Sequence, residues 1–237
     1  KYPIYADLHT HSISSGHGSE DTITDMIRCA SESGLSLFGI SDHGPATSSS
    51  AKSSYFQSLK LADRDRFGIR VLYGAELNII NTSGDVDLDD EILSALDYAI
   101  ISIHPPIFKP YHDKDLSSAY IRAMDHPKVR FLGHIDDARF PVDFEYLLEI
   151  AKEKHVYPEI NNGSLMPDAY RINGQENCRR ILSICKKLDL PVLLSSDSHG
   201  KKNIGNMQYI FPLLEELDFP AHLVLNSDLS VLSEIIR

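Results

Sequence analysis

Histidine and acidic side chains occur in this chain at spacings typical of a metal site. His9 and His11 lie two residues apart, and Asp197 and His199 repeat that spacing near the other end of the sequence. Residues two apart in an extended strand project to the same side, so each pair can offer two ligands to one ion. Imidazole-rich sites with some carboxylate suit zinc, and manganese or iron also accept them. The pattern predicts hydrolytic metal chemistry with a metal-bound hydroxide as the nucleophile.

Further histidine and acidic residues follow other apolar runs of the chain, and together with the two pairs they form the candidate metal ligands. These candidates are His9, His11, His17, His43, Glu76, His104, His134, Asp197 and His199. One zinc ion takes about three or four protein ligands, so this set is too large for a single ion. If Glu76 bridges two ions, the set suits three divalent ions, with zinc expected first and manganese or iron as alternatives.

The charge balance indicates what such a centre would bind. Three divalent ions opposed by two carboxylates leave a positively charged pocket, which would attract an anion such as a phosphate group. The whole chain instead carries a formal net charge of -11, from 23 Lys+Arg and 34 Asp+Glu. A protein that binds nucleic acid through the phosphate backbone needs a basic face, so nucleic acid is not expected as a partner. The expected partner is a small phosphorylated substrate.

Short apolar runs alternate with helical patterns and would position these ligands. Strands are expected at 4–8, 37–40, 71–77, 98–103, 129–132, 156–160 and 192–195. Helices are expected at 22–34, 55–62, 91–96, 116–124, 143–154, 176–188, 207–217 and 229–237. Strict alternation means parallel strands with crossover helices. Because ligands sit at the carboxyl ends of six of these strands, we expect a closed or nearly closed barrel rather than an open sheet, with the site at its mouth.

Length and composition bound the remaining possibilities. The chain has 237 residues, of which 42% are hydrophobic, so we expect one α/β domain over residues 1–237 rather than disorder. No apolar run approaches the roughly 18 residues of a membrane span, and no signal peptide is visible. The three cysteines lack CxxC spacing, which favours a reducing compartment and hence the cytoplasm. Homo-oligomerisation stays open.

The ligand-bearing motifs resemble those of the PHP (polymerase and histidinol phosphatase) family, in its YcdX-like bacterial phosphatase branch. The matching stretches run in order along nearly the whole chain: 7–11, 15–17, 40–45, 74–76, 104–105, 133–134, 159–162, 176–178 and 196–199. The resemblance implies a distorted (β/α)7 TIM-like barrel with a trinuclear zinc or manganese site. It also implies a phosphoesterase, and most concretely a phosphatase that hydrolyses small phosphomonoesters.

The resemblance also implies how the ligands divide among the ions. One ion would be held by His9, His11, Glu76 and Asp197. Glu76 would bridge to a second ion, held by His104 and His134. A third ion would be held by His17, His43 and His199. After Gly133-His134 the branch usually has a Pro-Gly pair, whereas this chain continues Ile135-Asp136-Asp137.

Two residues near the predicted mouth are candidate substrate contacts. Arg139 follows His134 in a region where the branch often carries a basic residue, and a solvated loop charge is the alternative. Asn162 follows the one predicted strand without a metal ligand, and a turn role is the alternative. His112, in the loop after the strand at 98–103, is the one further histidine that could reach the mouth.

Three other functions compete with the phosphatase interpretation. An amidohydrolase-type metallohydrolase also opens with His-x-His, but it typically bridges its metals with a lysine where this chain has Ile103-His104. A nuclease-like proofreading phosphodiesterase would need a basic strand-binding groove. Metal storage or protein binding would not need open strand ends with an excess of ligands. Metal analysis together with a phosphatase screen separates these possibilities.

Overall fold

Seven parallel strands lie side by side in the order β1-β3-β5-β6-β7-β8-β9 in the computed structural model, which describes residues 1–108 and 114–237. They are β1 (Ala6–Asp7), β3 (Leu37–Ile40), β5 (Ile69–Asn78), β6 (Tyr98–Ser102), β7 (Val129–Leu132), β8 (Tyr157–Asn161) and β9 (Leu193–Ser195). Short β4 (Asp65–Arg66) pairs antiparallel with β5. β2 (Thr10–His11) and β10 (Ser198–His199) form a separate parallel pair. The predicted nearly closed parallel barrel is confirmed.

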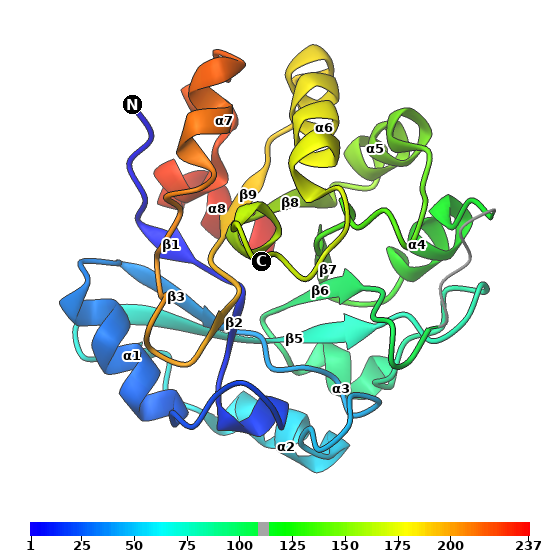
Figure 1. Cartoon of the computed structure of the whole chain (residues 1–237). Coiled ribbons are helices and arrows are strands. Elements are labelled where there is room, and N and C mark those ends of the chain that lie inside the picture. The colour runs from blue at the N-terminus through cyan, green and yellow to red at the C-terminus, as the bar shows by residue number, and fades with distance from the viewer. Residues whose placement is uncertain (109–113) are drawn as a thin grey trace.

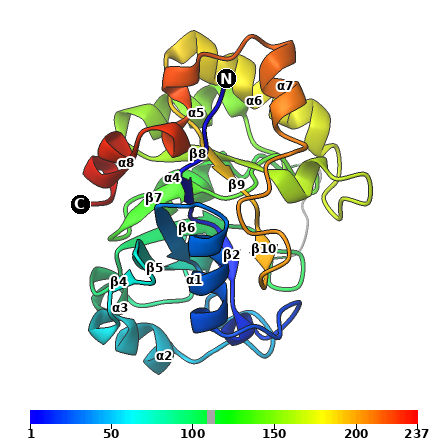
Figure 2. The same ribbon diagram turned by 90° about the vertical axis from the view of Figure 1, so that its left-hand side faces the viewer.

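Helices cover the outside of this barrel (Figures 1 and 2). They are α1 (Ile23–Glu32), α2 (Ser53–Ser58), α3 (Asp90–Ser94), α4 (Ser117–Ala123), α5 (Phe144–Glu153), α6 (Gly174–Leu188), α7 (Phe211–Glu216) and α8 (Leu229–Ile236). α1 begins with a capping box between Thr22 and Asp25. α7 is shorter than the helix expected at 207–217, because Pro212 lacks an N–H group and fits only the first turn of a helix. Among the described helices, none has the length and apolar character needed to span a membrane.

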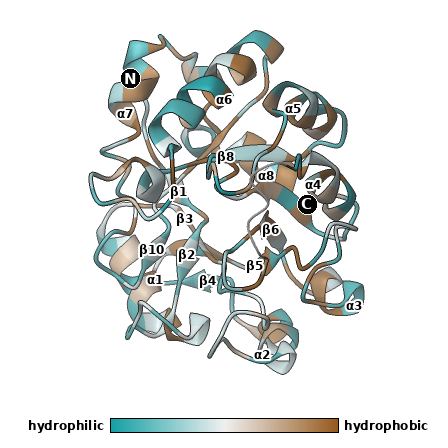
Figure 3. Ribbon diagram, turned by 45° about the vertical axis from the view of Figure 1, so that its right-hand side comes forward, coloured by the Kyte–Doolittle hydropathy of each residue, from teal (hydrophilic) through white to brown (hydrophobic). Residues whose placement is uncertain are grey.

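Tyr98 fills the interior of the barrel. Its hydroxyl donates a 2.5 Å hydrogen bond to the carbonyl of Leu8, which follows β1. A Cβ atom at Gly39 would lie 2.3 Å from that hydroxyl, and one at Gly74 would lie 2.8 Å from the ring, so both positions need glycine. Leu232 of α8 joins the same buried cluster, and Figure 3 shows α8 coloured mainly as hydrophobic. The interior is therefore a packed core, which confines the site to the mouth.

The row of strands is closed by the segment around Asn226 rather than by a regular ladder. Within the described residues no ladder pairs β9 with β1. Buried Asn226 bridges them instead: its Nδ2 donates to the carbonyls of Ala6 (2.8 Å) and Leu194 (2.7 Å), and its Oδ1 accepts from the Leu194 N–H (2.8 Å). Beyond the strand ends, the β2–β10 pair sets His199 opposite His11. The Asn226 segment thus joins the two ends of the row, and the separate β2–β10 pair brings two candidate ligands together.

Candidate metal centre and active site

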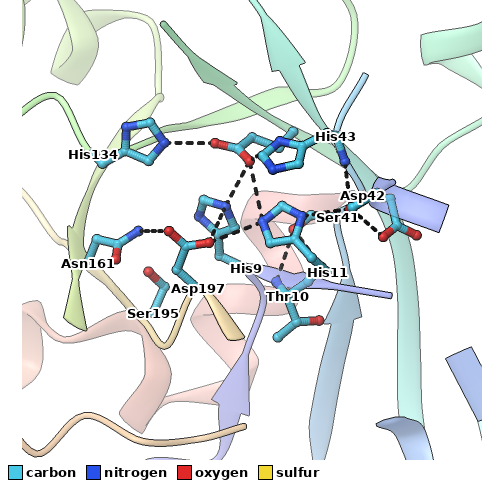
Figure 4. Close-up of polar contacts among 12 residues, drawn as sticks. His9, Thr10, His11, Ser41, Asp42, His43, His134, Asn161, Ser195 and Asp197 are labelled. Carbon is cyan, nitrogen blue, oxygen red and sulfur yellow. Dashed lines mark hydrogen bonds and ion pairs between the residues drawn. The ribbon is translucent and has the colours of Figure 1, made fainter. Parts of the chain in front are cut away.

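All nine candidate ligands lie at the carboxyl-terminal end of the barrel, where strands or the loops after them present their side chains. His11 and His199 belong to β2 and β10, and Glu76 lies in β5. The other six candidate ligands follow strands or short turns. Imidazole rings from distant parts of the chain stack on one another, and the ring centroids of His11 and His43 are 4.2 Å apart. His17 is exposed, and its ring centroid still lies 4.9 Å from that of His43. Figure 4 shows the inner part of this cluster.

The carboxylate of Glu76 lies at the centre of the cluster. Its Oε2 is 2.8 Å from His43 Nδ1, 3.2 Å from His9 Nε2 and 3.4 Å from His11 Nε2. Its Oε1 is 2.8 Å from His134 Nε2 and 3.2 Å from His104 Nε2. The two oxygens therefore face two different sets of imidazoles, as a bridging ligand requires.

Several buried atoms of the cluster have no hydrogen-bond partner among the described residues. They are His9 Nε2, His11 Nε2, His43 Nδ1, Glu76 Oε2 and Asp197 Oδ1. Leaving such atoms unpaired costs free energy, so their shared direction calls for a ligand. Three groups of residues each have donor atoms that lie within 4.8 Å of one another. The groups are His11 with His43 and His199, His9 with His11 and Glu76, and His43 with Glu76 and His104. Nitrogen and carboxylate donors in this arrangement fit divalent metal ions.

The electrostatics keep both carboxylates anionic. Burial opposes the charged form of Glu76, but neighbouring His9 and His104 hold its pKa well below the usual range. Burial acts in the same way on Asp197, and His9 and Arg171 lower its pKa well below the usual range. The ionised carboxylate is the form that binds a cation, so the site is prepared for metal without a change in these two groups.

Residues outside the ligand set turn the imidazoles toward the centre. Glu159 accepts a hydrogen bond from His9 Nδ1, which directs His9 Nε2 to the site. The same carboxylate accepts the backbone N–H of His134 at 2.7 Å. Asn78 Oδ1 lies 2.7 Å from His104 Nδ1, and Ser15 Oγ lies 3.0 Å from His11 Nδ1. Such partners set the tautomer and orientation of a ligating histidine.

The sequence analysis did not assign these orienting roles. Glu159 and Ser15 stand within the motifs that carry the family resemblance, but the spacing alone does not show which ring each one meets. Asp42 acts one step further out, because its carboxylate accepts hydrogen bonds of 2.7 Å from the Ser12 and Ser15 hydroxyls. Together these contacts form a shell of buried polar groups around the candidate ligands.

Two candidate ligands adopt a backbone conformation that usually favours glycine. His134 has φ 31° and Asp197 has φ 53°. Non-glycine residues in this left-handed region are uncommon and tend to cluster at functional sites. The backbone is therefore shaped to aim these two side chains.

A cavity of about 780 Å³ opens beside the cluster. Its lining includes the candidate ligands His17, His43, His104, Asp197 and His199. Arg171 also lines it, and its guanidinium donates to Asp197 Oδ2 at 2.7 Å and to Ser164 Oγ at 3.2 Å. The sequence analysis missed Arg171, because it lies 26 residues before Asp197 in an irregular segment with no motif.

The two predicted substrate contacts lie outside the lining formed by the described residues. Arg139 Nη2 pairs with Asp137 Oδ2 at 2.5 Å, and the Arg139 guanidinium lies 4.3 Å from the centre of the Tyr170 ring. Asn162 is buried and its Oδ1 accepts the backbone N–H of Tyr209 at 3.0 Å. Contact of either residue with substrate stays a prediction. His112 lies outside the described residues.

The acidic run after His134 divides into two environments. Asp137 faces Arg139, whereas Asp136 is fully buried and neither of its carboxylate oxygens has a hydrogen-bond partner in the described part of the chain. Burial raises the pKa of Asp136 to about 6. The run therefore does not line the cavity with two exposed negative charges.

Comparison with known proteins gives a consistent family assignment. A family model for the PHP domain matches residues 7–163. A probable phosphatase of Clostridium acetobutylicum is 37% identical over 100% of this chain and 95% of its own length. A probable phosphatase of Acetivibrio thermocellus is 34% identical over 98% of this chain and 94% of its own.

Solved structures share the fold. A putative histidinol phosphatase from Listeria monocytogenes has a TM-score of 0.64 at 18% identity, covering 87% of this chain and 99% of its own. Histidinol phosphate phosphatase from Lactococcus lactis, solved with zinc, L-histidinol and phosphate, has a TM-score of 0.62 at 19% identity, covering 91% and 94%. With the family model spanning well over half of the chain and full-length relatives above 30% identity, this protein belongs to the PHP family.

Proposed function

We propose that this chain is a divalent-metal-dependent phosphatase that hydrolyses small phosphomonoesters. The observation that carries the proposal is the Glu76 carboxylate, whose two oxygens face separate sets of imidazoles that include unpaired buried nitrogens. The full-length relatives named probable phosphatases support the reaction class. The open cavity beside the cluster supports a small substrate.

The proposal includes three ions, with zinc as the first metal to test and manganese or iron as alternatives. His9, His11 and Asp197 would hold one ion, and His104 and His134 would hold a second, with Glu76 between them. This division is supported by Glu76 Oε2 facing His9 and His11, while Oε1 faces His104 and His134. His17, His43 and His199, whose rings lie within 6 Å of one another, would hold the third. Bound divalent ions supply Lewis acidity and lower the pKa of a coordinated water.

The remaining residues have roles that need no assumption about metal geometry. Glu159 and Asn78 hold the imidazoles in position. Arg171 adds a positive charge to the cavity wall beside Asp197, which favours an anionic phosphate. In the reaction water adds to phosphorus, the ester P–O bond breaks, and the alcohol leaves with a proton.

The test is hydrolysis by the full chain before and after metal removal. We expect phosphomonoesters to be hydrolysed by protein loaded with zinc or manganese, to survive after chelation, and to be hydrolysed again when metal is returned. The same screen includes a phosphodiester and an amide, the substrates of the phosphodiesterase and amidohydrolase alternatives. A fully metal-loaded protein that hydrolyses the diester or amide but no monoester would overturn the proposal.

A further inference from the structure

The cavity is lined by chemically different groups. Five candidate metal ligands and Arg171 form the imidazole and charged portion of the lining. Thr47, Ser48 and Ser49 are polar lining residues, and Pro105, Pro106, Ile107 and Tyr170 add apolar and aromatic surface. Among the described lining residues, Arg171 and Asp197 are the only side chains of the Lys, Arg, Asp and Glu types, and they pair with each other. Apart from the histidines and this internal ion pair, the described lining therefore offers no charged side chain to recognise the leaving group.

Tyr170 is held in place although it is largely exposed. The residue is 72% exposed, yet its ring packs on the Arg139 guanidinium at 4.3 Å from the centroid. Arg139 is itself fixed by Asp137, because its Nε lies 3.0 Å from both carboxylate oxygens. An exposed aromatic ring fixed from one side and open to a cavity can stack on a flat ligand.

The backbone also fixes this ring relative to the segment that follows β7. The N–H of Ala138 donates to the carbonyl of Ile172 at 2.9 Å, and the N–H of Ile172 donates to Asp137 Oδ1 at 3.4 Å. These bonds join the loop that carries Arg139 to the loop that carries Tyr170. In Figure 1 the segment that leads into α6 lies across the centre of the barrel. Tyr170 is thus placed beside the cavity by two loops instead of one.

We propose that Tyr170, supported from behind by Arg139, is a stacking platform for a planar aromatic leaving group, so that the substrate class is an aryl or heteroaryl phosphomonoester. The inference rests on the proposed phosphatase function. The phosphate would lie at the imidazole end and the aromatic ring at the Tyr170 end. Hydrolysis breaks the P–O bond, phosphate receives the oxygen of water, and the aromatic alcohol leaves with a proton. Arg139 is a positioning residue that acts through Tyr170.

The test compares phenyl phosphate with the aliphatic ester 2-glycerophosphate in the metal-loaded protein. We expect Tyr170→Ala to lower kcat/KM for phenyl phosphate about tenfold, mainly through KM, because stacking on one aromatic side chain supplies that order of binding. Hydrolysis of 2-glycerophosphate should stay within about twofold, since this ester has no ring to stack. Tyr170→Phe should retain the preference, and Arg139→Gln should lose part of it. Tyr146→Ala, which removes another exposed tyrosine from α5, is the matched control and should change neither ester.

Binding of two non-hydrolysable anions separates this inference from the proposed function. Calorimetry with phenylphosphonate and methylphosphonate should give tighter binding of the phenyl compound, and Tyr170→Ala should remove the difference. If these binding results hold but no ester is hydrolysed, the platform stands and the phosphatase proposal fails. If both esters are hydrolysed and Tyr170→Ala changes them equally or not at all, the platform is wrong and the phosphatase proposal stands. Metal content of each variant shows that the centre is intact.

Discussion

Arg171 holds one oxygen of Asp197 and leaves the other directed at the histidines. Its Nη2 donates to Asp197 Oδ2 at 2.7 Å, and Asn161 Nδ2 donates to the same oxygen at 3.0 Å. Asp197 Oδ1 lies 3.2 Å from His11 Nε2 and 3.5 Å from His9 Nε2. The carboxylate is thus oriented from outside, as a metal ligand of this type usually is.

Replacing Arg171 should therefore weaken metal binding. Arg171→Met keeps much of the side-chain length but removes the donors and the charge, so Asp197 can rotate. We expect the affinity for at least one ion to fall about tenfold or more, the range seen when an orienting partner of a ligand is lost. Competition with a chelator measures the affinity. Arg179→Met, which breaks exposed ion pairs with Glu176 and Glu216, is the matched control, and an equal effect of both variants would contradict the orienting role.

Glu76→Gln tests the bridge between two ions. The substitution keeps the size of the side chain but removes its charge and one good ligand oxygen, so two neighbouring cations would repel with less compensation. We expect at least one ion per chain to be lost and phosphatase activity to fall about a hundredfold or more. Elemental analysis and a rate assay are done on the same preparation. Glu153→Gln, on the exposed side of α5, should retain both properties. Full metal content and full rate in Glu76→Gln would show that no bridge exists.

The buried carboxyl group of Asp136 should give the free energy of unfolding an unusual dependence on pH. Burial raises its pKa to about 6, above the value of 3.8 that applies to an aspartate in the unfolded chain. The unfolded state therefore loses its proton first, and this group lowers the free energy of unfolding as pH rises from about 4 to 6. Asp136→Asn removes this pH-dependent loss. We therefore expect the change in the free energy of unfolding caused by the substitution to be more favourable at pH 7.5 than at pH 4 by about 2 kcal/mol. Urea unfolding at both values measures the change.

Asp137 is the contrasting control for that experiment. Burial opposes its ionisation, but hydrogen bonds from Arg139 hold its pKa below the usual range. Its contribution to stability is therefore present at neutral pH and is lost as pH falls through the folded pKa. Asp137→Asn should lower the free energy of unfolding at pH 7.5, opposite in sign to Asp136→Asn. The same sign for both would refute the account of Asp136.

Asn226 is expected to contribute strongly to the closure of the barrel. Asn226→Ala leaves the buried N–H of Leu194 and the carbonyls of Ala6 and Leu194 without the partners they have in the folded chain. Each unpaired buried group costs about 1–3 kcal/mol, so we expect a loss of about 3 kcal/mol in the free energy of unfolding. Asn206→Ala removes a single loop hydrogen bond to Gln208 and should cost far less. Similar urea midpoints for the two variants would contradict the bridging role.

Much of the centre follows from local sequence alone. Each predicted strand is a short, mostly apolar run, and each helix has its own periodicity, so the alternation is visible without tertiary contacts. Parallel strands place their carboxyl ends at one mouth, which is why ligands such as His9, Glu76 and His134 could be expected to meet. Local patterns along the chain are therefore enough to predict the barrel and the residues of the candidate metal centre.

Tertiary structure decided which side chains serve these ligands. Glu159 meets His9 across 150 residues, and Arg171 reaches Asp197 from a segment without regular structure. Asn226, which bridges β1 and β9, lies in the short turn Leu225–Ser227. This turn has no hydrophobic periodicity that would mark it in the sequence. These contacts depend on loop conformation and on the reach of individual side chains. Neither property is encoded in spacing along the chain, so only the folded arrangement of the loops reveals them.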